Sequence, residues 1–264
     1  MKLSVGEKRG IWILLGIVVI ISLFILFSPL ISSQPYPEIV TMHVINLDRD
    51  KDKMERFKRH VSENLPNHMP VIRWKAVYGK ELDVKDMTKN GIGKTNYVVG
   101  KGVYKDQFKD LRNLGAIGCY LSHRSLIERL STIEAPAHAA HLILEDDVKI
   151  SPDLFSGKIL WNDIRKTIPN DWDIVYIGMT SPIGKQVRPG IQRLKTDYDG
   201  VGNWGTHAYL VRHGSLNKII NWLHYMVDAI DNQYNLKFNE WNVYAIDPPL
   251  IVTDDSIEST IQTM

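Results

Sequence analysis

Apolar and polar residues follow one another along the chain in patterns that predict strands and helices in turn. We expect strands at residues 39–47, 71–77, 141–150, 171–178, 202–211, 243–246 and 248–252. We expect helices with one apolar face at residues 53–64, 114–130, 154–168 and 215–227. The opening order of strand, helix and strand is typical of a nucleotide-binding half-domain, so the pattern predicts an α/β fold.

The first residues follow a different pattern. Residues 1–10 are polar and carry three basic side chains, and residues 11–31 are apolar and uncharged. A helix of that length reaches about 30 Å, the thickness of a bilayer core. A cleaved signal peptide is the alternative, but its apolar region is usually shorter and precedes a small-residue cleavage site. We therefore expect an uncleaved transmembrane signal-anchor.

The basic residues before the anchor place the N-terminus in the cytoplasm by the positive-inside rule. The protein would then be a single-pass type II membrane protein with its bulk on the lumenal or exterior side. Residues 32–38 are expected to form a short stem, and residues 39–264 a single domain.

Composition narrows the function classes. The formal net charge is +2, without the concentrated basic face of a nucleic-acid binder. The single cysteine, Cys119, excludes an intrachain disulfide and a cysteine-based zinc cage, and its apolar setting favours a buried small residue over a nucleophile. No Gly-x-Gly-x-x-Gly follows the first strand, which argues against a dinucleotide site.

The stretch HLILEDDVKI (141–150) carries the strongest chemical signal. An apolar run leads directly into Glu145, Asp146 and Asp147, at the strand end where open α/β sheets bind ligands. Adjacent carboxylates repel one another unless a cation or hydrogen-bond donors offset their charge. In an extended chain Glu145 and Asp147 share a face and suit Mg²⁺ or Mn²⁺ carrying a diphosphate, whereas Asp146 points away. A solvated acidic turn is the alternative.

Two further stretches carry candidate site residues. Glycines at the start of the helix 114–130 allow backbone N–H groups to approach a ligand, and Ser122 and His123 follow one turn later. A structural histidine is the alternative for His123. In the strand 202–211, His207 stands two residues before Tyr209, so both should face the same way, and His207 could complete a Mn²⁺ site.

Two segments lack periodicity. Residues 79–113 are polar and glycine-containing, which predicts a flexible insertion or lid, and residues 179–200 are expected to form a loop.

Several stretches together resemble glycosyltransferase family 25, the lipopolysaccharide glycosyltransferases of bacteria and their procollagen galactosyltransferase relatives. The matching pieces are VINLDRDKDKMERF (44–57), LGAIGCYLSHRSLIERL (114–130), HLILEDDVKI (141–150), DWDIVYIG (171–178) and GTHAYLVRHGSLNKII (205–220). The resemblance covers most of residues 40–252, and Asp231 falls where the family tends to place an acid.

The resemblance implies a GT-A-type nucleotide-binding sandwich with a mixed central sheet. It also implies inverting transfer of a sugar, galactose or glucose, from a UDP-sugar with Mn²⁺ or Mg²⁺. The acceptor would be a hydroxyl of a glycan, a lipid-linked glycan or a protein. The alternatives are a catalytically inactive membrane-anchored sugar-binding or scaffold protein of the same descent, and a metal-dependent phosphohydrolase, which would need more His and Asp ligands.

The same hypothesis gives each candidate residue a role. Glu145 and Asp147 are the expected metal ligands. His207 is a candidate further ligand, and Asp146 lies close by. Asp231 is the candidate catalytic base, with a metal-binding or acceptor-binding role as the alternative. The residues expected around the nucleotide are Asn46, Leu47, Arg49, Ser122 and His123.

Overall fold

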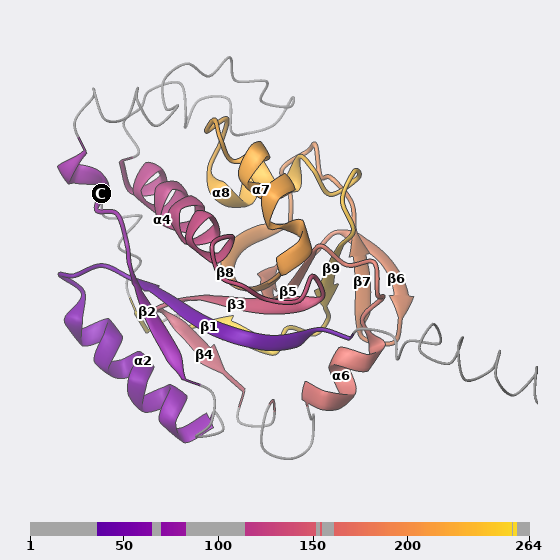
Figure 1. Ribbon diagram of the computed structural model, residues 1–264, viewed down its shortest axis with the longest axis horizontal. Coiled ribbons are helices and arrows are strands. Elements are labelled where there is room, and N and C mark those ends of the chain that lie inside the picture. The colour runs from indigo at the N-terminus through magenta and orange to yellow at the C-terminus, as the bar shows by residue number, and fades with distance from the viewer. Residues whose placement is uncertain are drawn as a thin grey trace, which may run out of the picture. The chain divides into compact units, whose positions relative to one another are not determined.

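A computed structural model describes residues 36–64, 70–82, 114–151, 154, 161–254 and 256–257 (Figure 1). The expected anchor at 11–31, and all of the expected insertion beyond residue 82, lie outside these residues. Among the helices of the described ranges, none is both long and apolar enough to cross a bilayer.

The described chain is organised around a mixed sheet of eight strands, so the expected α/β fold with a mixed central sheet is confirmed. In spatial order the strands are β2 (Val71–Lys75), β1 (Glu38–Asn46), β3 (Ala139–Glu145), β8 (Trp204–Arg212), β5 (Ile174–Thr180), β9 (Val243–Ile246), β7 (Ile191–Leu194) and β6 (Gly184–Arg188). β1 pairs in parallel with both β2 and β3, and β5 pairs in parallel with β9. The other pairings in this sheet are antiparallel.

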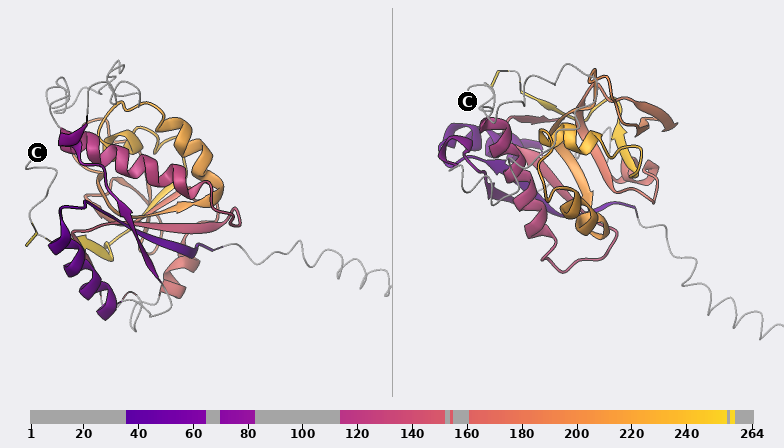
Figure 2. Two further views of the ribbon diagram at one scale, coloured as in Figure 1. Left: turned by 60° about the vertical axis from the view of Figure 1, so that its left-hand side comes forward. Right: turned by 90° about the horizontal axis from the view of Figure 1, so that it is seen from above.

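Helices cover both faces of the sheet (Figures 1 and 2). The α-helices are α2 (Lys51–Asn64), α4 (Leu114–Leu130), α6 (Trp161–Thr167), α7 (Leu216–Trp222) and α8 (Ile230–Asn235). One face packs against α4, α7 and α8. The other packs against α2, α6 and a small antiparallel sheet of β4 (Val148–Ile150) and β10 (Ile251–Thr253).

The two crossovers that flank β1 run on opposite faces. α2 connects β1 to β2 on one face, and α4 lies on the other face in the connection from β2 to β3. The chain therefore switches direction between β1 and β3, which are neighbours in the sheet. Open α/β sheets bind ligands in the crevice beyond the carboxyl ends of strands at such a switch point.

Alternation along β3 supplies both halves of the core. Leu142 and Leu144 pack on the α2 side and Ile143 packs on the α4 side, and all three are fully buried. A strand with both faces covered has no need of polar alternation, which explains its continuous apolar run.

α4 lies unusually close to the segment that follows β2. A methyl group at Gly118 would meet the Val77 carbonyl oxygen at 2.6 Å, so glycine is required for this approach. One turn later, the Ser122 hydroxyl accepts the Val77 N–H at 2.8 Å and donates to the Gly118 carbonyl. A methyl group at Gly79 would likewise overlap the carbonyl of Leu114, the first residue of α4.

The prediction that residues 179–200 form a loop is wrong, because β6 and β7 form a hairpin there. Every residue of β6 is exposed at the edge of the sheet, so the strand shows no apolar alternation. The turn of the hairpin is Pro189-Gly190, and Gly190 has a φ of +71°, which suits glycine.

α7 ends at Trp222, five residues before the predicted end. The buried Gln233 side chain forms hydrogen bonds with the backbone groups at and after this end. The Gln233 amide donates to the carbonyls of Trp222 and Tyr225 and accepts the Val227 N–H. These bonds replace helical hydrogen bonds over this segment and join α7 to α8.

Candidate active site

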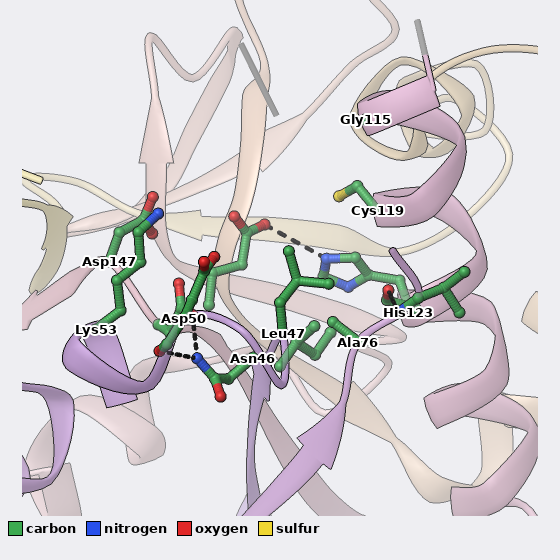
Figure 3. Close-up of a pocket in the computed structure, with 14 residues that line it drawn as sticks. Asn46, Leu47, Asp50, Lys53, Ala76, Gly115, Cys119, His123 and Asp147 are labelled. Atoms are coloured by element: carbon green, nitrogen blue, oxygen red, sulfur yellow. Dashed lines mark hydrogen bonds and ion pairs between the residues drawn. The ribbon is translucent and has the colours of Figure 1, made fainter. Parts of the chain in front are cut away.

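A cavity of about 70 Å³ lies in the crevice between the ends of β1 and β3 (Figure 3). Its walls come from the end of β1, the first turn of α2, one face of α4 and the acidic turn after β3. The site residues expected from sequence that line it are Asn46, Leu47, Ser122, His123, Glu145, Asp146 and Asp147. The fold thus brings together side chains that are about 100 residues apart.

The charge of the cavity wall is strongly negative. Among the described residues that line it, the carboxylates are Asp50, Glu145, Asp146 and Asp147, against one lysine, Lys53. Burial, together with the charges of Glu145 and Asp146, raises the pKa of Asp147 to about 7. Burial also raises the pKa of Asp146 to about 6, against the opposing hydrogen bond from Asn46. The direction of these shifts indicates that the described residues do not fully offset the clustered charge.

Asp147 is the acid with the least support from the protein. Its Oδ1 atom is buried and has no hydrogen-bond partner in the part of the chain that the structure describes. Asp146 and Asp147 form a turn between β3 and β4, which corrects the prediction of an extended chain with alternating faces. Because the chain turns, all three acids line one cavity.

Asn46 connects the two loops that form the crevice. Its Nδ2 donates to Asp146 Oδ2 at 2.6 Å and to the Asp50 carbonyl at 3.0 Å. Its Oδ1 accepts from Arg73 Nε at 2.8 Å, and Arg73 also pairs with Asp48 in the loop after β1. The amide therefore fixes the Asp146 carboxylate against the start of α2.

The cavity adjoins a larger hollow of about 780 Å³, and Leu47, Ala76 and Val77 line both. Arg49 lies in this hollow rather than in the cavity. Its guanidinium carbon is 5.0 Å from the centre of the Tyr78 ring, and it donates a hydrogen bond to the Tyr78 hydroxyl.

Glu145 faces α4 and β8. The Thr206 hydroxyl donates to Glu145 Oε1 at 3.0 Å, and His123 Nε2 lies 3.4 Å from the same oxygen. Burial tends to raise the pKa of Glu145, but the interactions with His123 and His207 and the Thr206 hydroxyl outweigh it and the pKa is lowered. The other nitrogen of His123, Nδ1, lies 2.8 Å from the Tyr209 hydroxyl, so the ring is held at both ends.

His207 lies outside the residues that line the cavity. A methyl group at Gly178 would meet both the His207 ring and the Ile251 carbonyl, so His207 faces the β10 side. Tyr209 faces α4 instead, and the prediction that the two share a face is wrong. The pairing of β5 with β8 shifts register on both sides of Gly178, and this irregularity breaks the alternation.

Asp231 lies at the start of α8 and also outside the cavity lining. Its carboxylate accepts the Gly205 N–H at 3.0 Å and the Asn232 N–H at 2.9 Å. Burial raises its pKa despite these hydrogen bonds, and the Glu145 charge raises it further. Asp231 is therefore within electrostatic reach of the acidic cluster.

Sequence reasoning missed Asp50, Lys53 and Thr206. Asp50 and Lys53 lie at the start of the helix after β1, a position that the switch-point rule identifies as a ligand site. Thr206 precedes the histidine that drew attention in the same strand, and no spacing rule singles it out. Cys119 also lines the cavity, and burial and nearby carboxylates raise the pKa of its thiol, which disfavours a nucleophilic role.

Comparison with known proteins identifies the family of this chain. Residues 39–233 match the profile of "Glycosyltransferase family 25 (LPS biosynthesis protein)". The chain is 28% identical over 156 residues to a "Glycosyltransferase 25 family member" of Drosophila pseudoobscura pseudoobscura, over 58% of this chain and 23% of that protein. A protein of Anopheles gambiae with the same name is also 28% identical over 156 residues, over 57% of this chain and 24% of its own length.

The chain spans about a quarter of the length of these curated relatives. The profile match covers well over half of the 264 residues and includes β1 from its second residue, α4, the acidic turn and Asp231. The chain therefore belongs to glycosyltransferase family 25, a family of hexosyltransferases.

Proposed function

We propose that this protein is a metal-dependent, inverting glycosyltransferase of the GT-A type. It would transfer a hexose, galactose or glucose, from a UDP-sugar to a hydroxyl of a glycan, a lipid-linked glycan or a protein. The observation that carries this proposal is the buried Asp147 Oδ1, which lacks a partner among the described residues in a cavity of four carboxylates. Family membership narrows the chemistry to glycosyl transfer.

The acidic cavity fits a hard divalent cation. Carboxylate oxygens are the ligands that Mg²⁺ and Mn²⁺ prefer, and Asp147 presents one that accepts no hydrogen bond from the described residues. Asp147 would hold the ion together with Glu145 at the end of β3, and Asn46 would keep Asp146 in place beside them. A cation held there would offset charge on the departing diphosphate.

The adjoining hollow is the proposed binding site of the nucleoside. Its volume of about 780 Å³ lies in the usual range for ligand pockets. Leu47 and Ala76 line both spaces, so a nucleotide could extend from the hollow to the acidic turn. The Arg49–Tyr78 pair would then form the outer wall against the base or ribose.

Asp231 is the proposed base that takes the proton of the acceptor hydroxyl. A base works best when its pKa lies nearer the working pH, and burial shifts the pKa of Asp231 in that direction. The N–H groups of Gly205 and Asn232 hold the carboxylate in one orientation. His207 faces the β10 side of the sheet, so it would pack behind the site and would not bind the ion.

The test is release of UDP from a panel of UDP-sugars by the full chain, with and without Mn²⁺. We expect metal-dependent turnover that an added acceptor increases, and loss of turnover in Asp147→Asn. The matched control is Asp163→Asn on α6, whose side chain is 71% exposed. Binding of a UDP-sugar without turnover would favour the scaffold alternative. Hydrolysis at the same rate whatever the sugar would favour a phosphohydrolase.

We further propose a type II membrane topology, with residues 11–31 as the anchor and the catalytic domain on the lumenal or exterior side. The uncharged apolar run and the basic residues before it support this topology. Protease treatment of sealed vesicles tests this topology. A domain inside the vesicle is protected from the protease, whereas a domain on the outer side is degraded. Recovery of the protein in the soluble fraction after lysis would contradict the anchor.

A further inference from the structure

Cys119 and His123 occupy one side of α4 and point toward the acidic turn (Figure 3). Residues four apart in a helix lie one above the other on the same face. The ligand atoms of Cys119, His123 and Glu145 all lie within 4.8 Å of one another, and all three residues line the cavity. Thiol, imidazole and carboxylate thus converge at its α4 wall.

This ligand set differs in kind from the oxygen atoms of the acidic turn. Sulfur and imidazole nitrogen suit Zn²⁺, whereas Mg²⁺ and Mn²⁺ prefer oxygen ligands. Two ligands at positions i and i+4 of a helix recur in zinc sites. A single cysteine rules out a closed cysteine cage, but three mixed ligands that leave the fourth position open are typical of accessible zinc ions.

The neighbouring side chains orient these ligands for a cation. The Tyr209 hydroxyl lies 2.8 Å from His123 Nδ1, which leaves Nε2 directed at Glu145. Thr206 donates to Glu145 and fixes its carboxylate. Such outer contacts are the usual means of aiming metal ligands. Tetrahedral Zn²⁺ places its ligand atoms about 3.5 Å apart. Side-chain rotations that move these atoms by about 1 Å would therefore bring them to this spacing.

Charge also favours a cation at this wall. Glu145 and Asp147 line the cavity beside Cys119, so carboxylate charge is concentrated at this wall. A divalent ion bound there would offset the charge of these carboxylates, and the thiol would release its proton to solvent on binding.

We propose that Cys119, His123 and Glu145 form a Zn²⁺ site separate from the position of the hard cation at Asp147. Because Glu145 belongs to both groups of ligands, Zn²⁺ there withdraws it from the acidic turn. That consequence rests on the proposed transferase function: Zn²⁺ is expected to inhibit Mn²⁺-dependent transfer, whereas Zn²⁺ binding itself does not depend on the reaction.

The test uses Co²⁺ as a spectroscopic probe of the full chain. Thiolate ligation of Co²⁺ gives a charge-transfer absorption in the near ultraviolet, and Cys119 is the only cysteine that can produce it. We expect this band on titration of the wild-type protein with Co²⁺, its displacement by equimolar Zn²⁺, and its absence in Cys119→Ser. Glu145→Gln should weaken the affinity for Co²⁺ at least tenfold.

His123 is fully buried, so His123→Gln is tested for folding by circular dichroism before its affinity is compared. The absence of a band in folded wild-type protein overturns the proposal. So does a band of unchanged affinity in Glu145→Gln, since Co²⁺ would then bind the thiol without the site. These outcomes are independent of UDP release, so failure of the zinc site and failure of the transferase function are distinguishable.

Discussion

Replacement of Asp147 by Asn should stabilise the metal-free protein at pH 8. Its carboxyl pKa rises from 3.8 to about 7 in the fold. A carboxyl with a raised pKa binds its proton more tightly when folded, so its contribution to stability falls as pH rises from about 4 to about 7. At 1.36 kcal/mol per pKa unit, full transfer of this shift would cost about 4 kcal/mol at pH 8. Partial exposure of Asp147 reduces this to about 2 kcal/mol.

The assay is thermal unfolding in a chelator at pH 5.5 and pH 8. For a domain of this size, about 2 kcal/mol corresponds to an increase in Tm of about 4–8 °C for Asp147→Asn at pH 8. The increase should be smaller at pH 5.5, where the wild-type carboxyl is mostly protonated. Asp163→Asn, at an exposed position on α6, should change stability by less than about 0.5 kcal/mol at either pH.

Addition of Mn²⁺ should reverse the order of the two proteins at pH 8. A ligand at one hundred times its Kd stabilises the folded state by about 2.7 kcal/mol, and only the wild type should gain this. The reasoning is refuted if Asp147→Asn is less stable than the wild type at both pH values without metal. An equal Mn²⁺-induced shift in both proteins would refute the metal assignment alone.

Three further substitutions test other contacts. Gln233→Leu leaves three backbone groups of residues 222–227 without partners, and a denaturant titration should show a loss of about 3 kcal/mol or more. Gly205→Ala imposes a side chain at a φ of +88° and disturbs the N–H that holds Asp231, so kcat should fall at least tenfold while Kd for UDP, measured by calorimetry, stays within about twofold. Asn46→Ala removes the hydrogen bond that lowers the pKa of Asp146, so the pH midpoint for Mn²⁺ binding should move upward; an unchanged midpoint would contradict this role.

The sequence predicted those elements whose apolar pattern reports burial. α4 packs along most of its length and has the predicted bounds, and the apolar part of the predicted strand 141–150 lies in β3, which is buried on both faces. The hairpin of β6 and β7 escaped prediction because β6 has no buried residue. Its available signal was the turn pair Pro189-Gly190.

The acidic cavity was predictable in position but not in detail. A strand that ends in three acids marks the ligand edge of an α/β sheet, and Glu145, Asp146 and Asp147 do line a cavity there. Their orientation depended on a turn, and that of His207 on a register shift opposite Gly178. Both are departures from regular geometry, which alternation rules cannot foresee.

The close contact between Gly79 and Leu114 fixes the distance between the two ends of the connection from β2 to α4. The two ends of that connection are held together by the packing of α4 and by the Ser122–Val77 hydrogen bond. Doubling the length of a loop with fixed ends adds only about 0.6 kcal/mol of closure entropy. A change in the number of residues between these two points should therefore cost little closure entropy while Gly79 and Leu114 stay in contact.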